Sequence, residues 1–410
     1  MKKIILIFPI FLSLFFLLPS PILSQQHVPW WDVQSIDTMK YSRDLAREKL
    51  KNASFDQIID QQVKNIAQTG STHIAIATPY DDEFLPYLTR WVKAARKYNL
   101  KVWLRGNFSG WEKWFDYRQI GRTEHTAKTK EFILQNKDLF EDGDIFTSCP
   151  ECENGGPGDP RITGDVLGYR KFLISEYTTI KDVFRQIRKD VRANLYSMNG
   201  DVARLIMDKE TTSRLDGVVT IDHYVATPEE LLQDIENIVK SSGGKVFLGE
   251  IGAPIPDIHG NMTEDQQANY IANTLSKLAH TDSLIGLNYW VNEGGSTQLW
   301  ENNQPRQAVP VIRTYFLPET LSGIIKNDIN QPIAEATIET KYKMTKSDND
   351  GRFQLPILPE ESQIAILAEG YQKKEVEFAS AEAKLTIVLQ SEHENILFRF
   401  LKFIRNAIRR

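Results

Sequence analysis

The 410-residue sequence has little cysteine and no strong excess of either charge. Its two cysteines exclude a disulfide-dense scaffold and a zinc site of four thiolates. The formal net charge of −5, from 49 basic and 54 acidic residues, excludes a generally basic nucleic-acid-binding protein. No Gly-x-Gly-x-x-Gly motif follows a predicted strand, so a dinucleotide-binding fold has no support.

Long hydrophobic runs are also scarce, and the most pronounced one lies at the N-terminus. It extends from Ile4 to Leu18, which is shorter than the about 20 residues of a membrane span. Lys2 and Lys3 precede the run, and Pro19 and the residues after it break it. This layout predicts a signal peptide over residues 1–24, and hence a secreted or cell-surface protein. An uncleaved membrane anchor is the alternative.

The C-terminal segment 395–410 has the pattern of a basic amphipathic helix. Helical spacing places Phe400 and Phe403 on one side and Arg399 and Lys402 on the other. Such a helix is typical of contact with a membrane surface. A terminal helix that packs on its own protein is an equally good interpretation.

What the sequence does contain is enough apolar residues for a large core, at 41% hydrophobic and 10% aromatic. Between residues 27 and 318, short apolar segments alternate with longer helical ones, which favours a parallel α/β architecture. The predicted strands are 31–35, 73–77, 101–105, 144–148, 192–197, 217–222, 245–250 and 284–290. The predicted helices are 55–68, 83–97, 127–137, 169–189, 228–241 and 265–279. Eight such units match the size of a (β/α)8 TIM barrel, with an open doubly wound sheet as the rival.

From residue 321 to 390 the helical pattern stops and short alternating strands follow. Turn and core residues recur there in a fixed order, which is Gly323, Pro332-Ile333-x-x-Ala336, Asp348-x-Asp350-Gly351-x-Phe353 and Gly370-Tyr371. This order resembles the carboxypeptidase regulatory-like domain, a small all-β sandwich of immunoglobulin-like or transthyretin-like form. The resemblance implies an accessory module without chemistry of its own.

Polar and aromatic residues gather where the predicted barrel strands end, which is where the active sites of such barrels lie. The segment 249–252, with the sequence Gly-Glu-Ile-Gly, follows an apolar strand. His223 and Tyr224 follow another strand, and Trp290 ends the last one. Carboxylates surrounded by aromatic side chains suit sugar chemistry.

These segments resemble the clan A glycoside hydrolases, cellulase-like and mannanase-like retaining TIM barrels. The resemblance covers the barrel at the level of motifs, and it implies that Glu250 is the nucleophile on the seventh strand. It also implies an acid/base glutamate on the fourth strand, where the family usually shows Asn-Glu. Here neither Glu151 nor Glu153 follows an asparagine. We favour Glu153, because a proline three residues earlier fits the longer form of the family, and we keep Glu151 as the alternative.

The remaining site residues are predicted around these carboxylates. Arg105, His223 and Tyr224 would hold Glu250 charged and oriented, although Arg105 could equally pair with Asp37 or Asp144. The aromatic faces of Trp290, Trp111 and Trp114 would meet the C–H surfaces of a sugar, although the three-residue spacing of the last two also fits a core face. The other predicted substrate-binding residue is Asn154.

Cys149 and Cys152 form a Cys-x-x-Cys pair in the same segment. A loop rich in glycine and proline follows instead of a helix, which argues against a thioredoxin-like site. We favour a structural disulfide, which an exported chain could form from its only two cysteines, over free thiols, and both over metal binding, since only His223 lies at a strand end near the pair. The sequence therefore predicts an exported glycosidase that acts on a polysaccharide or oligosaccharide. It predicts no cofactor, no metal and no nucleic-acid partner. The alternatives are an inactive carbohydrate-binding barrel and a thiol–disulfide oxidoreductase.

Overall fold

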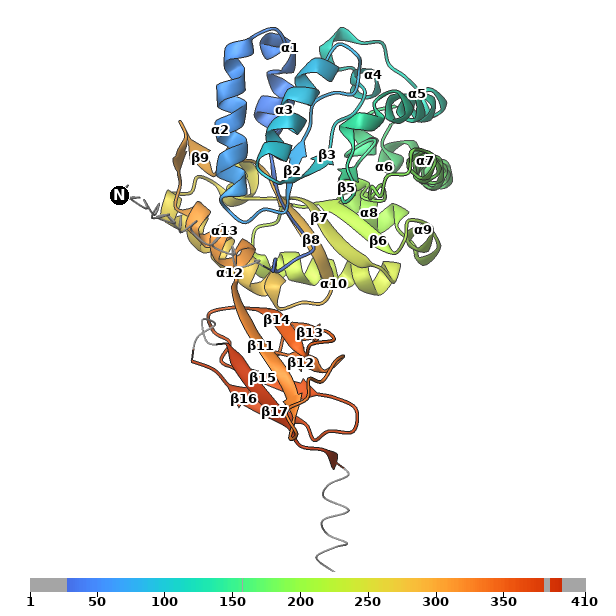
Figure 1. Cartoon of the computed structure of the whole chain (residues 1–410). Coiled ribbons are helices and arrows are strands. Elements are labelled where there is room, and N and C mark those ends of the chain that lie inside the picture. Colours follow the sequence, from blue (N-terminus) through green and yellow to red (C-terminus); the bar gives the residue numbers. More distant parts are fainter. Residues whose placement is uncertain (1–27, 157, 380–383, 393–410) are drawn as a thin grey trace, which may run out of the picture.

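The computed structural model describes residues 28–156, 158–379 and 384–392, and it places a barrel above a smaller all-β unit (Figure 1). The predicted signal peptide at 1–24 and the predicted helix at 395–410 lie outside the described residues. Among the helices that are described, none is both long and apolar enough to cross a membrane.

Eight parallel strands form the centre of the barrel, in the order β4-β3-β2-β1-β8-β7-β6-β5. A parallel bridge between Ile145 and Arg192 joins the two ends of this sheet, so the sheet closes on itself. The strands are β1 (Val33–Asp37), β2 (His73–Ile76), β3 (Lys101–Leu104), β4 (Ile145–Phe146), β5 (Ser197–Asn199), β6 (Val218–Asp222), β7 (Lys245–Ile251) and β8 (Leu284–Tyr289).

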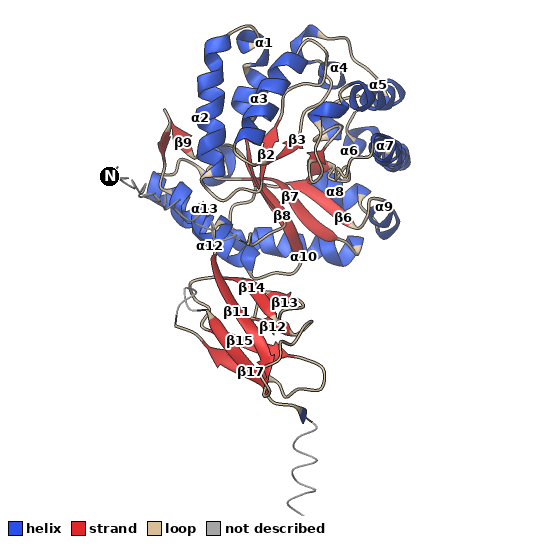
Figure 2. Cartoon of the chain, viewed as in Figure 1, coloured by secondary structure: helices blue, strands red, loops and turns tan. Residues whose placement is uncertain are grey.

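Helices surround the strands, as Figure 2 shows. The longer ones are α2 (Asp56–Ala67), α3 (Leu85–Lys97), α5 (Arg122–Gln135), α7 (Val166–Ile187), α10 (Pro228–Ser242), α12 (Glu264–Ala279) and α13 (Ala308–Phe316). Local sequence explains where two of them begin. Thr227 caps α10 and Thr263 caps α12, each in a reciprocal capping box with the third helical residue. The predicted α/β barrel is confirmed at this level.

Shorter elements occupy the connections between the strands and the long helices. They are α1 (Ala46–Lys49), α4 (Ser109–Glu112), α6 (Pro160–Thr163), α8 (Gly200–Ile206), α9 (Lys209–Arg214), α11 (Pro256–His259), the π-helix η1 (Lys40–Asp44), the 3-10 turns η2 (Ala53–Phe55), η3 (Trp114–Asp116), η4 (Lys137–Leu139) and η5 (Cys152–Asn154), and the hairpin β9 (Trp300–Glu301) with β10 (Gln304–Pro305). The strand predicted at 192–197 forms regular pairing only from Ser197, because β5 is short and begins late.

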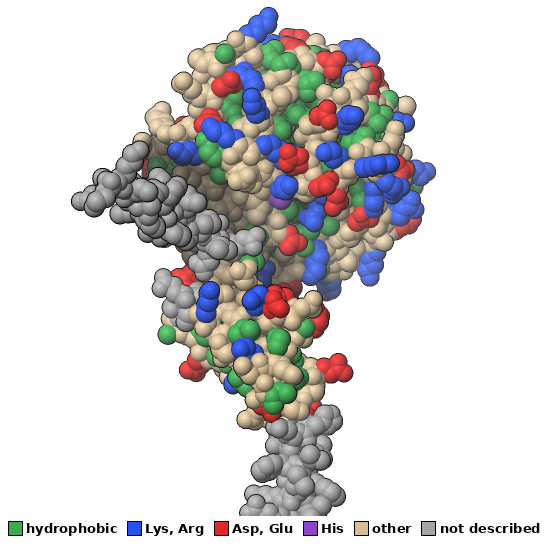
Figure 3. All heavy atoms as spheres, viewed as in Figure 1, with side chains coloured by type: hydrophobic (Ala, Val, Ile, Leu, Met, Phe, Trp, Pro, Cys, Tyr) green, Lys and Arg blue, Asp and Glu red, His purple; other side chains and the backbone are tan. Residues whose placement is uncertain are grey.

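Large apolar side chains fill the interior of the barrel, so it is a packed core and not a pore. Trp103 and Phe247 meet there edge to face, with 5.2 Å between their ring centroids. A second apolar layer lies between strands and helices. The described surface carries acidic and basic side chains side by side, as Figure 3 shows for one face, which agrees with the nearly balanced charge.

The all-β unit consists of two sheets that share one core and form a sandwich. The sheets contain β14 (Arg352–Ile357), β11 (Glu319–Asn327) and β17 (Leu385–Leu389), and β13 (Met344–Lys346), β12 (Thr337–Glu339), β15 (Gln363–Leu367) and β16 (Lys374–Glu377). Gly351 has φ +74° in the turn before β14, and an added Cβ would lie 2.4 Å from the carbonyl oxygen of Ile325. The turn therefore needs glycine. That this sandwich belongs to the carboxypeptidase regulatory-like family stays a prediction.

The sandwich contacts the barrel at the end where the strands begin and the helices end. Tyr342 stacks on His280, with 3.9 Å between ring centroids, and the Lys343 ammonium lies 4.9 Å from the centre of the Trp30 ring. His280 also pairs with Glu360 at 3.1 Å. Only two residues separate α13 from β11, so the two units are joined by a short link and by direct side-chain contacts.

Candidate active site

The polar residues predicted at the strand ends converge on one buried arginine. Arg105 follows β3 directly, and its side chain is fully buried. Because parallel strands bring their carboxyl ends to the same rim, Asp37 at the end of β1, Asp222 at the end of β6 and Glu250 near the end of β7 surround it. The sequence analysis offered Glu250 or Asp37 as partners of Arg105, and the structure has both.

The guanidinium of Arg105 divides its contacts among these carboxylates. Its Nη1 lies 2.7 Å from Glu250 Oε1 and 3.3 Å from Asp37 Oδ2. Its Nη2 lies 2.7 Å from Asp222 Oδ2 and 3.2 Å from the Ser197 hydroxyl. Charge-assisted contacts of this kind fix the orientation of both partners.

Glu250 accepts a second hydrogen bond from a tyrosine. The Tyr224 hydroxyl donates to Glu250 Oε2 at 2.8 Å, while Arg105 donates to Oε1. Both carboxylate oxygens therefore face donors, which favours the ionised form. Burial, followed by the charge of Glu250, holds the pKa of Tyr224 well above its usual range, so the phenol keeps its proton.

Asp37 has donors on both oxygens, whereas Asp222 does not. Asp37 Oδ1 accepts from the Met39 backbone N–H at 2.6 Å, and Oδ2 accepts from Asn288 at 3.1 Å. Burial raises the pKa of Asp37 to about 6, against the lowering effect of Arg105. Burial likewise raises the pKa of Asp222 well above its usual range.

Glu151 lies on the loop after β4 and shares the electrostatic environment of Glu250. Its backbone adopts φ +46°, and its N–H donates to the Ser197 carbonyl oxygen at 2.8 Å. Burial, then the charge of Glu250, then that of Glu153 raise the pKa of Glu151 to about 7. Asn154, predicted to bind substrate, is exposed and donates to Glu151 Oε2 at 2.9 Å.

Glu153 is more deeply buried, and both of its oxygens accept hydrogen bonds from the surrounding protein. Oε1 accepts from the Asn199 backbone N–H at 2.7 Å, and Oε2 accepts from the Tyr169 hydroxyl at 3.2 Å. Burial raises the pKa of Glu153. These contacts join the loop to β5 and α7, so the preference for Glu153 over Glu151 as acid/base finds no geometric support.

Trp290 borders the site beside Tyr224. The two rings meet edge to face at 6.3 Å, and Trp290 is half-buried. The Lys40 ammonium on η1 lies 5.5 Å from the centre of the Trp290 ring. Through Tyr224, the ring is adjacent to Glu250, which is where the sequence analysis expects a sugar-binding surface.

Trp111 does not lie at the sugar-binding surface predicted for it. It is 1% exposed, stacks on Phe172 and donates its indole N–H to the Cys152 carbonyl oxygen at 3.1 Å. Its neighbour Trp114 is half-buried and lies under the Arg43 guanidinium, 4.8 Å from the ring centre. The alternative interpretation of Trp111 as a core residue is therefore the correct one.

His223 also has a different role from the one predicted. Its Nε2 pairs with Asp234 on α10 at 2.7 Å, and its backbone N–H donates to the Glu250 carbonyl oxygen at 3.1 Å. The imidazole thus binds a helix carboxylate, and it is Tyr224, the next residue, that contacts the Glu250 carboxylate. Side chains of consecutive residues diverge at a strand end, which the motif alone did not resolve.

The two cysteines are joined in a disulfide between Cys149 and Cys152, and both are buried. Within the described residues, one group has metal-ligand atoms close together, namely His125, Cys149 and Glu176, within 4.8 Å. Because the Cys149 sulfur is in the disulfide, it offers no thiolate to a metal. His125 in turn contacts Glu176 and Asn107.

The sequence analysis missed two carboxyl groups, Asp222 beside Arg105 and Glu112 near Glu151. Glu112 ends α4, and burial raises its pKa to about 8, with the charge of Arg43 opposing and that of Glu151 adding to the shift. No motif pointed to Glu112, because it ends a helix of one turn in the segment after β3. Its only sequence signal was the nearby aromatic pair.

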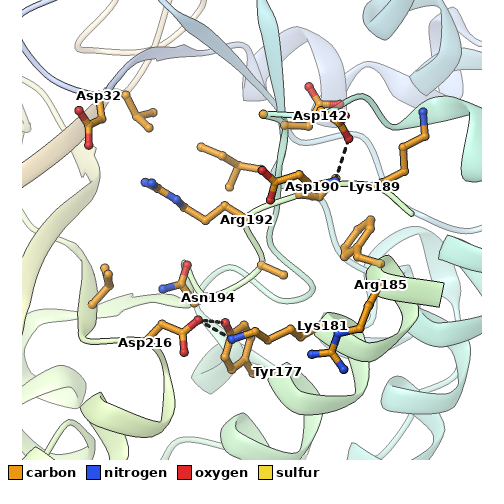
Figure 4. A pocket seen from close by; sticks show the side chains of 18 of the residues that line it. Asp32, Asp142, Tyr177, Lys181, Arg185, Lys189, Asp190, Arg192, Asn194 and Asp216 are labelled. Carbon is orange, nitrogen blue, oxygen red and sulfur yellow. Dashed lines mark hydrogen bonds and ion pairs between the residues drawn. The ribbon is translucent and has the colours of Figure 1, made fainter. Parts of the chain in front are cut away.

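A cavity of about 890 Å³ lies at the opposite end of the barrel (Figure 4). His73, Val218 and Ile285 from the starts of strands line it, together with Arg192 and Asp216. None of the carboxylates grouped around Arg105 lines it. This cavity is therefore separate from the candidate active site.

No protein-family model matches this sequence. A 179-residue stretch is 27% identical to penicillin-binding protein 1A of Streptococcus pneumoniae and covers 42% of this chain and 24% of that protein. The chain thus spans about a quarter of that relative.

Solved structures match much more of the chain. A GH5_18 protein from Streptomyces cattleya in complex with GlcNAc has a TM-score of 0.52 at 12% identity, covering 72% of this chain and 83% of that one. A variant of GH5_18 from the same organism, in complex with Manb1-4GlcNAc, has a TM-score of 0.51 at 11% identity, covering 73% and 85%. These likenesses show that the chain shares the α/β-barrel fold of glycoside hydrolases.

Proposed function

We propose that the protein is a retaining glycosidase in which Glu250 is the nucleophile and Glu151 is the acid/base. The observation that carries this proposal is the environment of the two carboxyl groups. Glu250 receives hydrogen bonds from Arg105 and Tyr224 on both oxygens. Glu151 has its pKa raised to about 7, and the charge of Glu250 contributes to that shift. Two carboxyl groups in opposed protonation states are what this chemistry requires.

The reaction would proceed in two steps. In the first, a Glu250 oxygen bonds to the anomeric carbon while the bond to the leaving oxygen breaks, and Glu151 gives that oxygen its proton. In the second, Glu151 takes a proton from water, and the water oxygen displaces Glu250 from the anomeric carbon. Arg105 and Tyr224 orient Glu250 for the attack. Their hydrogen bonds stabilise its negative charge again when the carboxylate is released in the second step.

The choice of Glu151 replaces our preference from the sequence. Glu153 already has one hydrogen-bond donor on each oxygen, from Asn199 and Tyr169. It is also 4% exposed, whereas Glu151 is half-buried. An acid/base group must reach both the leaving oxygen and a water molecule, and Glu151 meets this requirement better.

The substrate class we propose is a polysaccharide or oligosaccharide, with the Trp290 ring as the surface for a sugar face. The half-buried ring beside Tyr224 supports this assignment. Export through the predicted signal peptide and contact with a membrane surface through the segment 395–410 are part of the same proposal. They rest on the sequence patterns alone.

Replacement of each carboxyl group tests the function. Glu250→Gln should lower kcat on a cleavable glycan by on the order of 10³-fold or more, because the amide is not a nucleophile. Glu151→Ala should slow hydrolysis strongly, and added azide should restore turnover as a glycosyl azide of retained configuration. A screen of glycans with the wild-type protein comes first, to supply the substrate.

Glu153→Gln is the matched control at the same loop. It keeps the size of the side chain, and we expect a loss of stability with kcat reduced by no more than about 10-fold. A Glu153 variant that is rescued by azide, with Glu151→Ala still active, would reverse the assignment. Wild-type sugar binding that survives in Glu250→Gln, with no hydrolysis by either protein, would support the inactive carbohydrate-binding barrel.

The oxidoreductase alternative is less well supported. Cys149 is 0% exposed and Cys152 is 1% exposed, so a partner thiol has no access to either sulfur. The disulfide instead closes the short turn that contains Glu151. We therefore propose a structural role for it.

A further inference from the structure

One guanidinium serves three carboxyl groups at the base of the proposed site. The side chains of Arg105 and Asp37 are 0% exposed, that of Asp222 is 2% exposed and that of Glu250 is 11% exposed. Throughout the described ranges, no other cation pairs with these three acids. With every group ionised, one positive and three negative charges would leave two negative charges uncompensated. Burial makes that state costly, and a bound proton relieves it.

The hydrogen bonds indicate that two of the three acids, Asp37 and Glu250, do not carry the proton. Asp37 accepts from Met39 on one oxygen and from Asn288 and Arg105 on the other. Glu250 accepts from Arg105 on one oxygen and from Tyr224 on the other. A proton on any of these oxygens would face a donor, so both groups keep their negative charge.

Asp222 is different because one of its oxygens is unoccupied. Oδ2 accepts from Arg105 at 2.7 Å, but Oδ1 is buried and has no hydrogen-bond partner among the described residues. Oδ1 faces the backbone of Gly249, where an added Cβ would lie 2.4 Å away. The charged groups that act on Asp222 are Arg105 after β3, Glu250 on β7 and Glu151 from the loop after β4, and a hydrogen bond with the Ser197 side chain also lowers its pKa.

We propose that Asp222 is a positioning residue that holds Arg105 as a neutral carboxylic acid, with its proton on Oδ1. The charge of the guanidinium is then shared by Asp37 and Glu250 alone. The group of four carries one positive and two negative charges, which is a net charge of −1. This negative charge faces the sugar ring, where positive charge develops in the transition state.

The proposed catalytic cycle gives this arrangement a further consequence. When Glu250 bonds to the anomeric carbon it becomes a neutral ester, and Arg105 and Asp37 then balance each other. Asp222 can stay neutral through this change, so the buried group passes from −1 to 0 without taking up a proton. This catalytic meaning rests on the proposed function, whereas the protonation of Asp222 does not.

Infrared difference spectroscopy of the resting protein tests the protonation directly. The difference between the wild type and Asp222→Asn at neutral pH should contain the C=O stretch of one protonated carboxyl group. The difference between the wild type and Asp37→Asn should contain a carboxylate band instead. A carboxylate band for Asp222→Asn would overturn the proposal. Because no turnover is needed, this result is independent of whether the protein is a glycosidase.

A variant of the neighbouring Glu250 provides a second test, which does not depend on the folding of Asp222→Asn. Glu250→Gln removes a negative charge that keeps the proton on Asp222. The band of the protonated carboxyl group should therefore titrate at lower pH in Glu250→Gln than in the wild type. A band that titrates at the same pH in both proteins would contradict the assignment to Asp222.

The pH dependence of activity gives a second readout. Asp222→Asn keeps a neutral partner for Arg105, so we expect kcat to fall by less than about 10-fold while both limbs of the pH profile stay in place. Asp222→Ala removes the partner, and kcat should fall by about 100-fold. A shift of the basic limb to lower pH by about one unit in Asp222→Asn would mean that a negative charge had been lost, contrary to the proposal.

Discussion

At the residue scale, the site depends on how one arginine is shared. Arg105 contacts Glu250 and Asp222 at 2.7 Å through different nitrogens, so its fork is held by the neighbouring strands β7 and β6. A lysine at this position has no rigid fork and could not make both contacts in the same way. The arginine therefore provides geometry as well as charge.

The sequence motifs at the predicted strand ends identified some of the site residues and not others, for physical reasons. Glu250, Tyr224 and Arg105 lie at or just after the carboxyl ends of parallel strands, so their convergence on one rim follows from the strand order, although the register between β6 and β7 is irregular at Asp222. Trp111 is a core residue, and the His223 imidazole contacts Asp234 instead of the Glu250 carboxylate, because a strand end or loop fixes position but not side-chain direction. Whether Glu151 or Glu153 enters the site depends on the left-handed backbone at Glu151, which no spacing rule indicates.

The pKa of Glu151 predicts how activity depends on pH. The acid/base must be protonated for the first step, so kcat/KM should fall as the pH rises through about 7. The hydrogen bond from Asn154 lowers the pKa of Glu151. Asn154→Ala should therefore raise this pKa and move the basic limb to higher pH, by about half a unit.

The control for this prediction is Asn237→Ala, an exposed asparagine on α10 that is remote from the site. Its pH–rate profile should match that of the wild type. A basic limb that moves to lower pH in Asn154→Ala would show that the hydrogen bond stabilises the protonated form instead. The measurement is kcat/KM over a pH series for the three proteins.

At the element scale, the loop between β4 and α6 is the least regular part of the barrel and carries the proposed acid. The disulfide, the Glu153 contacts and the packing of two glycines on Trp111 hold it. Each of these ties is non-local or needs a particular backbone shape. The sequence predicted the long helices well because their apolar periodicity is local, and it predicted this loop poorly because its shape is not.

Gly155 tests whether the loop is held by close backbone contact. An added Cβ would lie 2.3 Å from the Trp111 carbonyl oxygen and 2.5 Å from the indole ring. Backbone cannot move aside as a flexible side chain can, so Gly155→Ala should lower the free energy of unfolding by about 1–3 kcal/mol. Because the loop also positions Glu151, kcat should fall with it. Thermal unfolding and kinetics measure the two effects.

Gly121 provides the matched control, since a Cβ there would meet nothing within 4 Å. It precedes α5 with an ordinary extended backbone, at φ −96°. Gly121 is the N-cap of α5, where alanine is less favourable than glycine, so Gly121→Ala should lower the free energy of unfolding by no more than about 1 kcal/mol and leave the kinetics alone. Equal effects of the two substitutions would mean that Gly155 matters for chain entropy and not for its contact with Trp111.

At the scale of the whole molecule, the barrel and the sandwich share an interface of aromatic and charged side chains. The change from helical to alternating periodicity near residue 320 was visible in the sequence, because it reflects local patterns. The contact itself was not, because His280 and Tyr342 are remote in the chain and neither belongs to a motif. Burial lowers the pKa of Lys343 at this interface, although the side chain is only half-buried.

This interface predicts how the two units unfold. If the contact between Tyr342 and His280 couples the barrel to the sandwich, the wild type should show one calorimetric transition. Neither unit can then unfold without breaking the stacked pair. Tyr342→Ala removes an aromatic contact worth about 0.5–1.5 kcal/mol beyond its buried area, and it should split or broaden that transition. Met344→Ala, at a 70% exposed position two residues away, should not. Two separate transitions in the wild type would show that the sandwich is an independent appendage, whose contacts with the barrel add nothing to the stability of the proposed active site.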